Sequence, residues 1–76
     1  MKVKIAGTTG TLDVEVQDGY TVKDVLVEAA NRLGLENPVE TVERLTPLVD
    51  SKPAQLSDPV APEARRVAAS PNAVNG

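Results

Sequence analysis

Residues 11–34 read TLDVEVQDGYTVKDVLVEAANRLG, and this stretch decides the fold. Its first part, residues 11–17, alternates leucine and valine with polar side chains, which is typical of a strand covered on one side only. An Asp-Gly pair then ends the alternation. After it, Thr21 is a good N-cap residue, and the apolar residues that follow recur at helical spacing. The stretch therefore predicts a strand, a break and a helix over residues 22–33.

The segment before this stretch predicts a partner for its strand. Residues 2–7 read KVKIAG and alternate lysine with valine and isoleucine. Gly10 offers the backbone freedom that a tight connection needs, so the two strands are expected to form an antiparallel hairpin. In this hairpin we expect Lys4 to face Asp13 or Glu15 on the solvent side, a pair that contributes about 0.2–1 kcal/mol.

The segment after the helix is less regular. Gly34 suits the position just past a helix end, and Pro38 is expected to prevent further helix. Residues 40–44 fit either a short turn or the approach to a strand, and Pro47 would place part of the next strand at an edge or a bulge. The remaining expectations are strands at 45–49, 54–56 and 65–70, with Val67 and Ala69 inward, a turn at 50–53 and a loop at 57–64.

Composition argues against several classes of function. The 76 residues suffice for one small domain, and they include neither cysteine nor histidine, which removes thiolate chemistry, the usual general base and the commonest metal ligand. We therefore expect no enzyme activity, no catalytic residue and no bound metal. The net charge of −3 argues against nucleic acid as a partner, because phosphate binding rests on clustered cations. No stretch approaches a membrane span and residues 1–4 lack the apolar character of a signal peptide, so a cytoplasmic protein with no membrane contact is expected. We also expect a monomer.

Four side chains near the helix start have a structural and a functional interpretation. Tyr20 is the only aromatic residue, and a lone tyrosine at this position packs on the edge of a domain more often than it contacts a partner. Asp18, Asp24 and Glu28 lack the spacing of a calcium-binding loop. We interpret them as capping and solubilising residues rather than as metal ligands.

Four motifs follow one another in a characteristic order. They are YTVKDVL at residues 20–26, LVDSKP at 48–53, LSDPV at 56–60 and EARRV at 63–67. Their order and spacing resemble those of ubiquitin-like proteins, closest to the ThiS/MoaD group of sulfur carriers. The resemblance implies an α+β, β-grasp fold, a mixed sheet of four to five strands with one main helix packed across it. From Pro71 onward the chain lacks the apolar content to pack, so we expect a domain over residues 1–70 and a flexible C-terminal tail over residues 71–76.

Sulfur carriers of this group react at the carboxylate of a terminal glycine, which Gly76 matches. A partner enzyme uses ATP to adenylate that carboxylate, and sulfur then replaces AMP. The resemblance therefore implies that Gly76 is the carrier or conjugation terminus, that the chain itself holds no cofactor, and that an adenylating activating enzyme is the partner. The chain departs from the family at Asn75, because the family ends in two glycines, and at Ser51, where the family has a turn glycine.

Two interpretations of function remain open. In the first, the chain is a sulfur carrier or a protein modifier. In the second, it is a non-conjugating β-grasp interaction module, for example a small accessory or phage-encoded domain, and Gly76 is simply where the chain ends. The family resemblance favours the first, whereas Asn75 and the charged face of the sheet favour the second.

In either interpretation, the exposed face of the sheet is the expected docking surface for a protein partner. Lys2, Lys4 and Arg66 are expected to share this face, since the first and last strands of a β-grasp sheet are neighbours. Leu45 or Leu48 is expected to contribute to it. The alternative is a solvated face on which these cations are paired with acidic side chains of the neighbouring strand. Because the other residues expected on this face are mainly charged, an apolar patch of the ubiquitin type is not expected.

Overall fold

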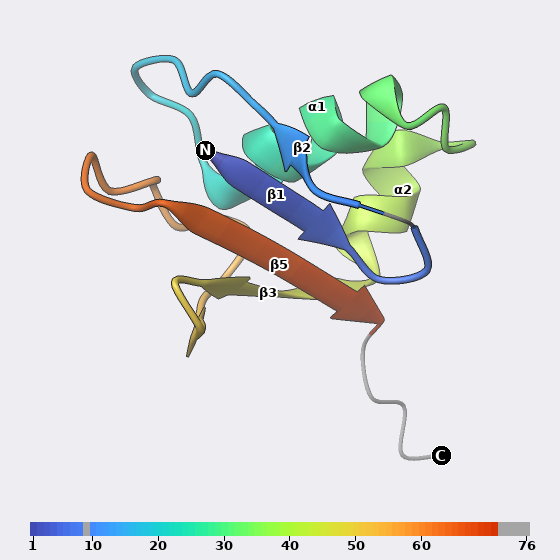
Figure 1. The fold of residues 1–76 in the computed structure, drawn as a ribbon. Coiled ribbons are helices and arrows are strands. Elements are labelled where there is room, and N and C mark those ends of the chain that lie inside the picture. Colours follow the sequence, from blue (N-terminus) through green and yellow to red (C-terminus); the bar gives the residue numbers. More distant parts are fainter. Residues whose placement is uncertain (9, 72–76) are drawn as a thin grey trace.

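The computed structural model describes residues 1–8 and 10–71, which form a sheet with two helices on one side of it (Figure 1). The sheet has five strands in the order β2-β1-β5-β3-β4. β1 and β5 run parallel, whereas the other neighbours are antiparallel. The expected α+β class, with a mixed sheet and one main helix, is therefore confirmed. The elements are β1 (Lys2–Ile5), β2 (Leu12–Asp13), α1 (Val22–Arg32), α2 (Pro38–Glu43), β3 (Leu45–Val49), β4 (Lys52–Pro53) and β5 (Arg66–Pro71).

β1 and β2 form the expected hairpin, but its register differs from the expectation. Met1 and Val14 exchange two backbone hydrogen bonds, and this pairing places Lys2 opposite Asp13. The Lys2 ammonium and the Asp13 carboxylate lie 2.9 Å apart. The prediction that Lys4 faces Asp13 or Glu15 is therefore wrong, because Lys4 lies two residues closer to the turn. Only two residues of the predicted second strand are regular strand, although Val14 beyond them is buried as expected.

α1 begins and ends where the sequence predicts. The Asp24 amide donates to the Thr21 hydroxyl oxygen, and the Thr21 amide donates back to the Asp24 carboxylate at 2.9 Å, which completes a capping box. Gly34 follows the helix with a φ of 74°, the left-handed conformation that glycine adopts at least cost. The buried side of α1 consists of Val22, Val25, Leu26, Ala29 and Ala30.

α2 contradicts the expectation that Pro38 prevents further helix. Pro38 is instead the first residue of this second helix, after Asn37 in the left-handed conformation at a φ of 48°. Proline suits the first helical position because its fixed φ is already helical and the amide hydrogen it lacks has no partner there. α2 contributes Val42 to the core, at 0% exposure.

β3 runs through the proline that was expected to weaken it. Pro47 pairs with Ala69 of β5, and its carbonyl accepts a hydrogen bond from the Ala54 amide on the side away from β5. Because the N and O of one strand residue point the same way, the missing amide hydrogen faces away from β5, and the ladder between β3 and β5 loses nothing. The short strand after the turn is β4 at Lys52–Pro53, earlier than the predicted residues 54–56.

The turn between β3 and β4 holds two non-glycine residues in the left-handed conformation. Asp50 has a φ of 49° and Ser51 a φ of 68°, which is the two-residue turn that matches the twist of a hairpin. Aspartate accepts this conformation better than serine does.

We expect Ser51→Gly to raise the free energy of unfolding by about 0.5 kcal/mol, because relief of the left-handed strain exceeds the extra entropy of glycine in the unfolded chain. Urea denaturation of the two proteins measures the difference. Ser70→Gly makes the same chemical change in the extended strand β5, where it should destabilise. Equal effects of the two substitutions would contradict the role of the turn conformation.

The core lies between the sheet and α1 and is aliphatic. Val67 and Ala69 of β5 point into it as predicted. Pro71 pairs with Leu45 and is the last residue of β5, so the strand extends one residue past the expected domain boundary. The tail predicted beyond it, residues 72–76, lies outside the described residues. The other buried apolar residues are Val3, Ile5, Val14, Val22, Val25, Leu26, Ala29, Ala30, Val42 and Leu45.

Candidate functional site

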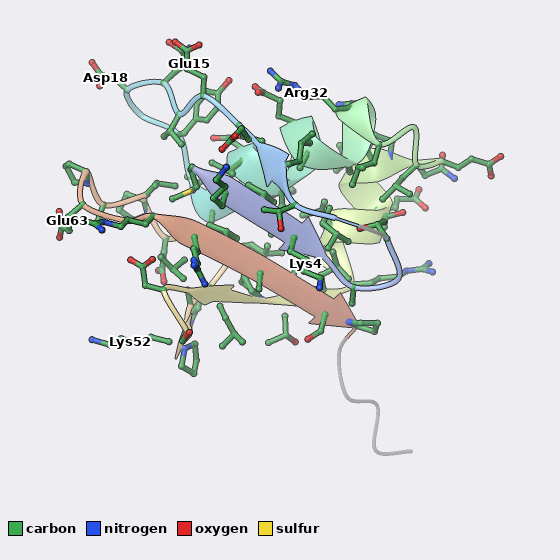
Figure 2. The ribbon with its side chains drawn as sticks, viewed as in Figure 1. Lys4, Glu15, Asp18, Arg32, Lys52 and Glu63 are labelled. Carbon is green, nitrogen blue, oxygen red and sulfur yellow. The ribbon has the colours of Figure 1, made fainter. Side chains whose placement is uncertain are left out.

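The side of the sheet opposite the helices carries three cations around a small apolar floor. The parallel register places Lys2 beside Arg66 and Lys4 beside Ala68, and the antiparallel register places Leu48 beside Ala68. These five residues, called here the outer sheet face, line one shallow depression. Figure 2 shows Lys4 on this side of the sheet, away from the helices. The structure therefore brings Lys2, Lys4 and Arg66 together as the sequence predicts.

Leu45 does not belong to the outer sheet face. Side chains alternate along β3, so Leu45 and Pro47 point into the core while Leu48 points outward. Leu45 is only 8% exposed. Of the two leucines proposed for docking, Leu48 alone is placed to contact a partner. Together with Ala68 it forms an apolar floor, which the sequence does not reveal because Leu48 and its neighbour Ala68 lie on strands that are separated along the chain.

The outer sheet face is positively charged although the whole chain carries −3. Lys2 is paired with Asp13, and the Asp50 carboxylate accepts from the backbone amides of Arg65 and Arg66 rather than from a cationic side chain. Among residues 1–8 and 10–71, neither Lys4 nor Arg66 has an ion-pair partner. The face therefore presents two free cations beside an apolar floor, an arrangement suited to an acidic protein surface.

The ion pair on this face gives a prediction about the Asp13 carboxyl group. Its hydrogen bond with Lys2 holds the pKa of Asp13 below the usual 3.8. Because the pKa is lower in the folded than in the unfolded protein, the pair stabilises the fold above the unfolded pKa. That contribution is lost as the pH falls through the folded pKa, below 3.8.

In Lys2→Ala we expect the pKa of Asp13 to rise back toward 3.8, as followed by NMR titration of the carboxyl carbon. Lys4→Ala removes a lysine of the same face that does not contact Asp13, and it should leave the titration nearly unchanged. An unaltered Asp13 titration in Lys2→Ala would rule out this hydrogen bond as the main cause.

Tyr20 packs on the edge of the core, as the sequence predicts. It is half-buried against the core cluster, and its hydroxyl donates to a Glu28 carboxylate oxygen at 3.0 Å. This hydrogen bond raises the pKa of Tyr20, because it favours the protonated hydroxyl. Asp24 caps α1, and Glu28 also pairs with Arg32. In the described part of the chain, no group of three histidine, cysteine or acidic side chains could hold a metal ion.

The remaining sequence predictions concern residues that the structure does not describe. Asn75 and Gly76 lie outside the described residues, so their role stays a prediction. Within the described ranges, no helix has the length and apolar content to cross a membrane. Comparison of the chain with protein-family models, with curated proteins and with solved structures gives no match.

Proposed function

We propose that this chain is a ubiquitin-like β-grasp protein that acts as a sulfur carrier or protein modifier of the ThiS/MoaD type. The observation that carries the proposal is the sheet. Its first and last strands are parallel neighbours at the centre, with a hairpin on either side and one main helix across one face. This is the arrangement that the sequence motifs imply. It leaves the chain to continue from β5, the central strand, toward Gly76.

In this proposal the chain contributes a carboxylate and a docking surface, and the partner contributes the chemistry. An activating enzyme would use ATP to form an acyl-adenylate at Gly76, with release of pyrophosphate. A sulfur donor would then displace AMP to leave a thiocarboxylate. The outer sheet face supports the docking step, because Lys4 and Arg66 offer free charges and Leu48 offers an apolar contact.

Mass spectrometry of the intact protein tests the carrier function. After incubation with ATP, a sulfur donor and a ThiS/MoaD-type activating enzyme, we expect the chain to gain the mass of an adenylate or of a thiocarboxylate. Asn75→Gly should form the product at an equal or higher rate, because glycine enters a narrow channel without a side chain. Complete absence of product from both proteins, beside a carrier that the same enzyme converts, would refute the proposal.

The second candidate is a non-conjugating interaction module that uses the same outer sheet face. Asn75 is the observation that favours it, since it places a polar side chain where the family has glycine. One pair of variants distinguishes the two candidate functions. A module would lose partner binding in Arg66→Glu and would be indifferent to Asn75→Gly, whereas a carrier would respond to both.

A further inference from the structure

A groove lies between two loops at the end of the sheet where β1 and β5 begin. One wall is the loop over residues 15–19, the other is the loop over residues 61–64, and the groove has a volume of about 550 Å³. Figure 2 shows Glu15 and Asp18 on the first loop and Glu63 on the second, at the same end of the molecule. A hollow of this volume is within the range of ligand-binding sites.

The floor of this groove is apolar. Met1, Val16 and Val60 line it, and each packs against the core while part of its surface stays open to solvent. A ligand that covered this remaining surface would gain free energy, because apolar area is then removed from water. The floor therefore suits an aliphatic side chain.

Backbone hydrogen bonds hold both walls of the groove in place. The Tyr20 amide donates to the Gln17 carbonyl at 3.1 Å, which closes the first loop. The Ala64 amide donates to the Ala61 carbonyl at 3.0 Å, which closes the second. The Val60 amide donates to the Tyr20 carbonyl at 3.1 Å and so ties one loop to the other. Because the groove is already formed, a ligand would not have to order it, and less conformational entropy is lost on binding.

The charge of the groove comes from the first loop. Glu15 and Asp18 line it, both are exposed, and neither has an ion-pair partner among residues 1–8 and 10–71. Met1 brings an ammonium group to this end of the molecule, but that group already donates to the Val14 carbonyl at 3.0 Å. The residues that line the other wall are alanine and proline. The groove therefore favours a cationic ligand, which could pair with the two free carboxylates.

Charge and shape together indicate a basic segment of a partner protein as the occupant. Lysine and arginine carry their charge on a long apolar stem, so they could reach the rim while an aliphatic side chain between them fills the hollow. Nucleic acid is disfavoured, because its binding rests on cations that meet phosphate. A second copy of the chain would offer Lys4 and Arg66, but these line a depression on the outer sheet face, and two hollows do not fit into each other.

We propose that this groove binds a segment of a partner protein in which one aliphatic side chain is flanked by lysine or arginine. The aliphatic side chain would occupy the apolar floor, and the flanking cations would pair with Glu15 and Asp18. The groove lies where β5 begins, whereas the chain continues toward Gly76 from the other end of that strand. The proposal therefore does not depend on the carrier function or on the outer sheet face.

Amide NMR of the whole chain tests the proposal, in a titration with a blocked five-residue peptide of glycine, lysine, leucine, lysine and glycine. We expect saturable shifts that centre on the amides of residues 15–19 and of Val60 and Ala64. The same peptide with glutamate in place of both lysines should not cause these shifts. The peptide with alanine in place of leucine should bind several-fold more weakly, because less apolar surface leaves water.

A pair of double variants tests the role of the two carboxylates. Glu15→Gln combined with Asp18→Asn removes both charges and keeps the size of the side chains. It should bind the lysine peptide more weakly by on the order of tenfold, the combined effect of two exposed ion pairs. Glu36→Gln combined with Glu40→Gln removes the same charge from two exposed positions outside the groove, and it should bind as the unaltered chain does.

Several results would overturn the proposal. They are equal binding of the lysine and glutamate peptides, shifts centred on the outer sheet face, and the absence of saturable shifts. An equal loss in the two double variants would also contradict it, because net charge alone would then explain the binding. If sedimentation showed dimers that the lysine peptide dissociates, a second copy would be the occupant instead. Amide dispersion in the same spectra verifies that each variant folds.

Discussion

Leu26→Ala is expected to lower the free energy of unfolding by about 2–5 kcal/mol, the range for a fully buried leucine truncated to alanine. Leu26 is 0% exposed and is the largest of the fully buried side chains. It lies on the buried side of α1 and belongs to the aliphatic core cluster, so its truncation leaves a cavity in the core. A domain of this size has a small free energy of unfolding, so a substantial unfolded population of Leu26→Ala is expected at 37 °C.

Urea denaturation followed by circular dichroism measures this effect. Leu33→Ala is the matched control, since it makes the same truncation directly after α1 at a side chain that is 37% exposed. We expect the control to lose less than about 1 kcal/mol, because little apolar surface returns to water. If the two variants were equally stable, the assignment of Leu26 to the centre of the core would be wrong.

Asp50→Ala is expected to lower the free energy of unfolding by about 2–3 kcal/mol through two separate losses. The Asp50 carboxylate accepts from the amides of Arg65 at 3.1 Å and Arg66 at 3.0 Å, which ties the β3–β4 turn to the start of β5. Alanine would leave those amides without this acceptor. It would also have to adopt the φ of 49° that aspartate tolerates more readily.

Two further variants separate the two losses. Asp50→Asn keeps an acceptor oxygen and tolerates the left-handed conformation, so it should cost less than alanine does. Asp50→Gly removes the acceptor but relieves the backbone, and it should fall between the two. If glycine restored full stability, the hydrogen bonds to β5 would contribute nothing and the turn conformation alone would explain the loss.

Local patterns in the sequence predicted some elements of the fold well. The helix over residues 22–33 was predicted within one residue of α1, because its cap, its apolar spacing and its terminal glycine all report on neighbours a few residues away. The expectation that Pro38 prevents further helix is wrong because it too rests only on neighbouring residues. Proline ends one helix and begins another equally well, and only the packing of Val42 against α1 distinguishes the two outcomes.

The candidate site was predicted in part. Alternation along β1 and β5 places Lys2, Lys4 and Arg66 outward, and a parallel pairing of these strands brings them together. The choice between Leu45 and Leu48 could not be made from the sequence, because their strand is apolar on both sides of its proline. The hydrogen bond from Arg32 to the Asp13 carbonyl could not be predicted from the sequence either, since it joins a helix end to a strand 19 residues away.

The amino-acid pattern thus specified which segments are strand or helix and which side of each strand is apolar. Those properties follow from side chains and backbone within one or two turns of each residue. The register of β1 against β2 and the apolar floor of Leu48 and Ala68 arise only when distant segments meet. They depend on backbone hydrogen bonds, and every residue offers nearly the same amide and carbonyl, so no local pattern in the sequence distinguishes one pairing from the next.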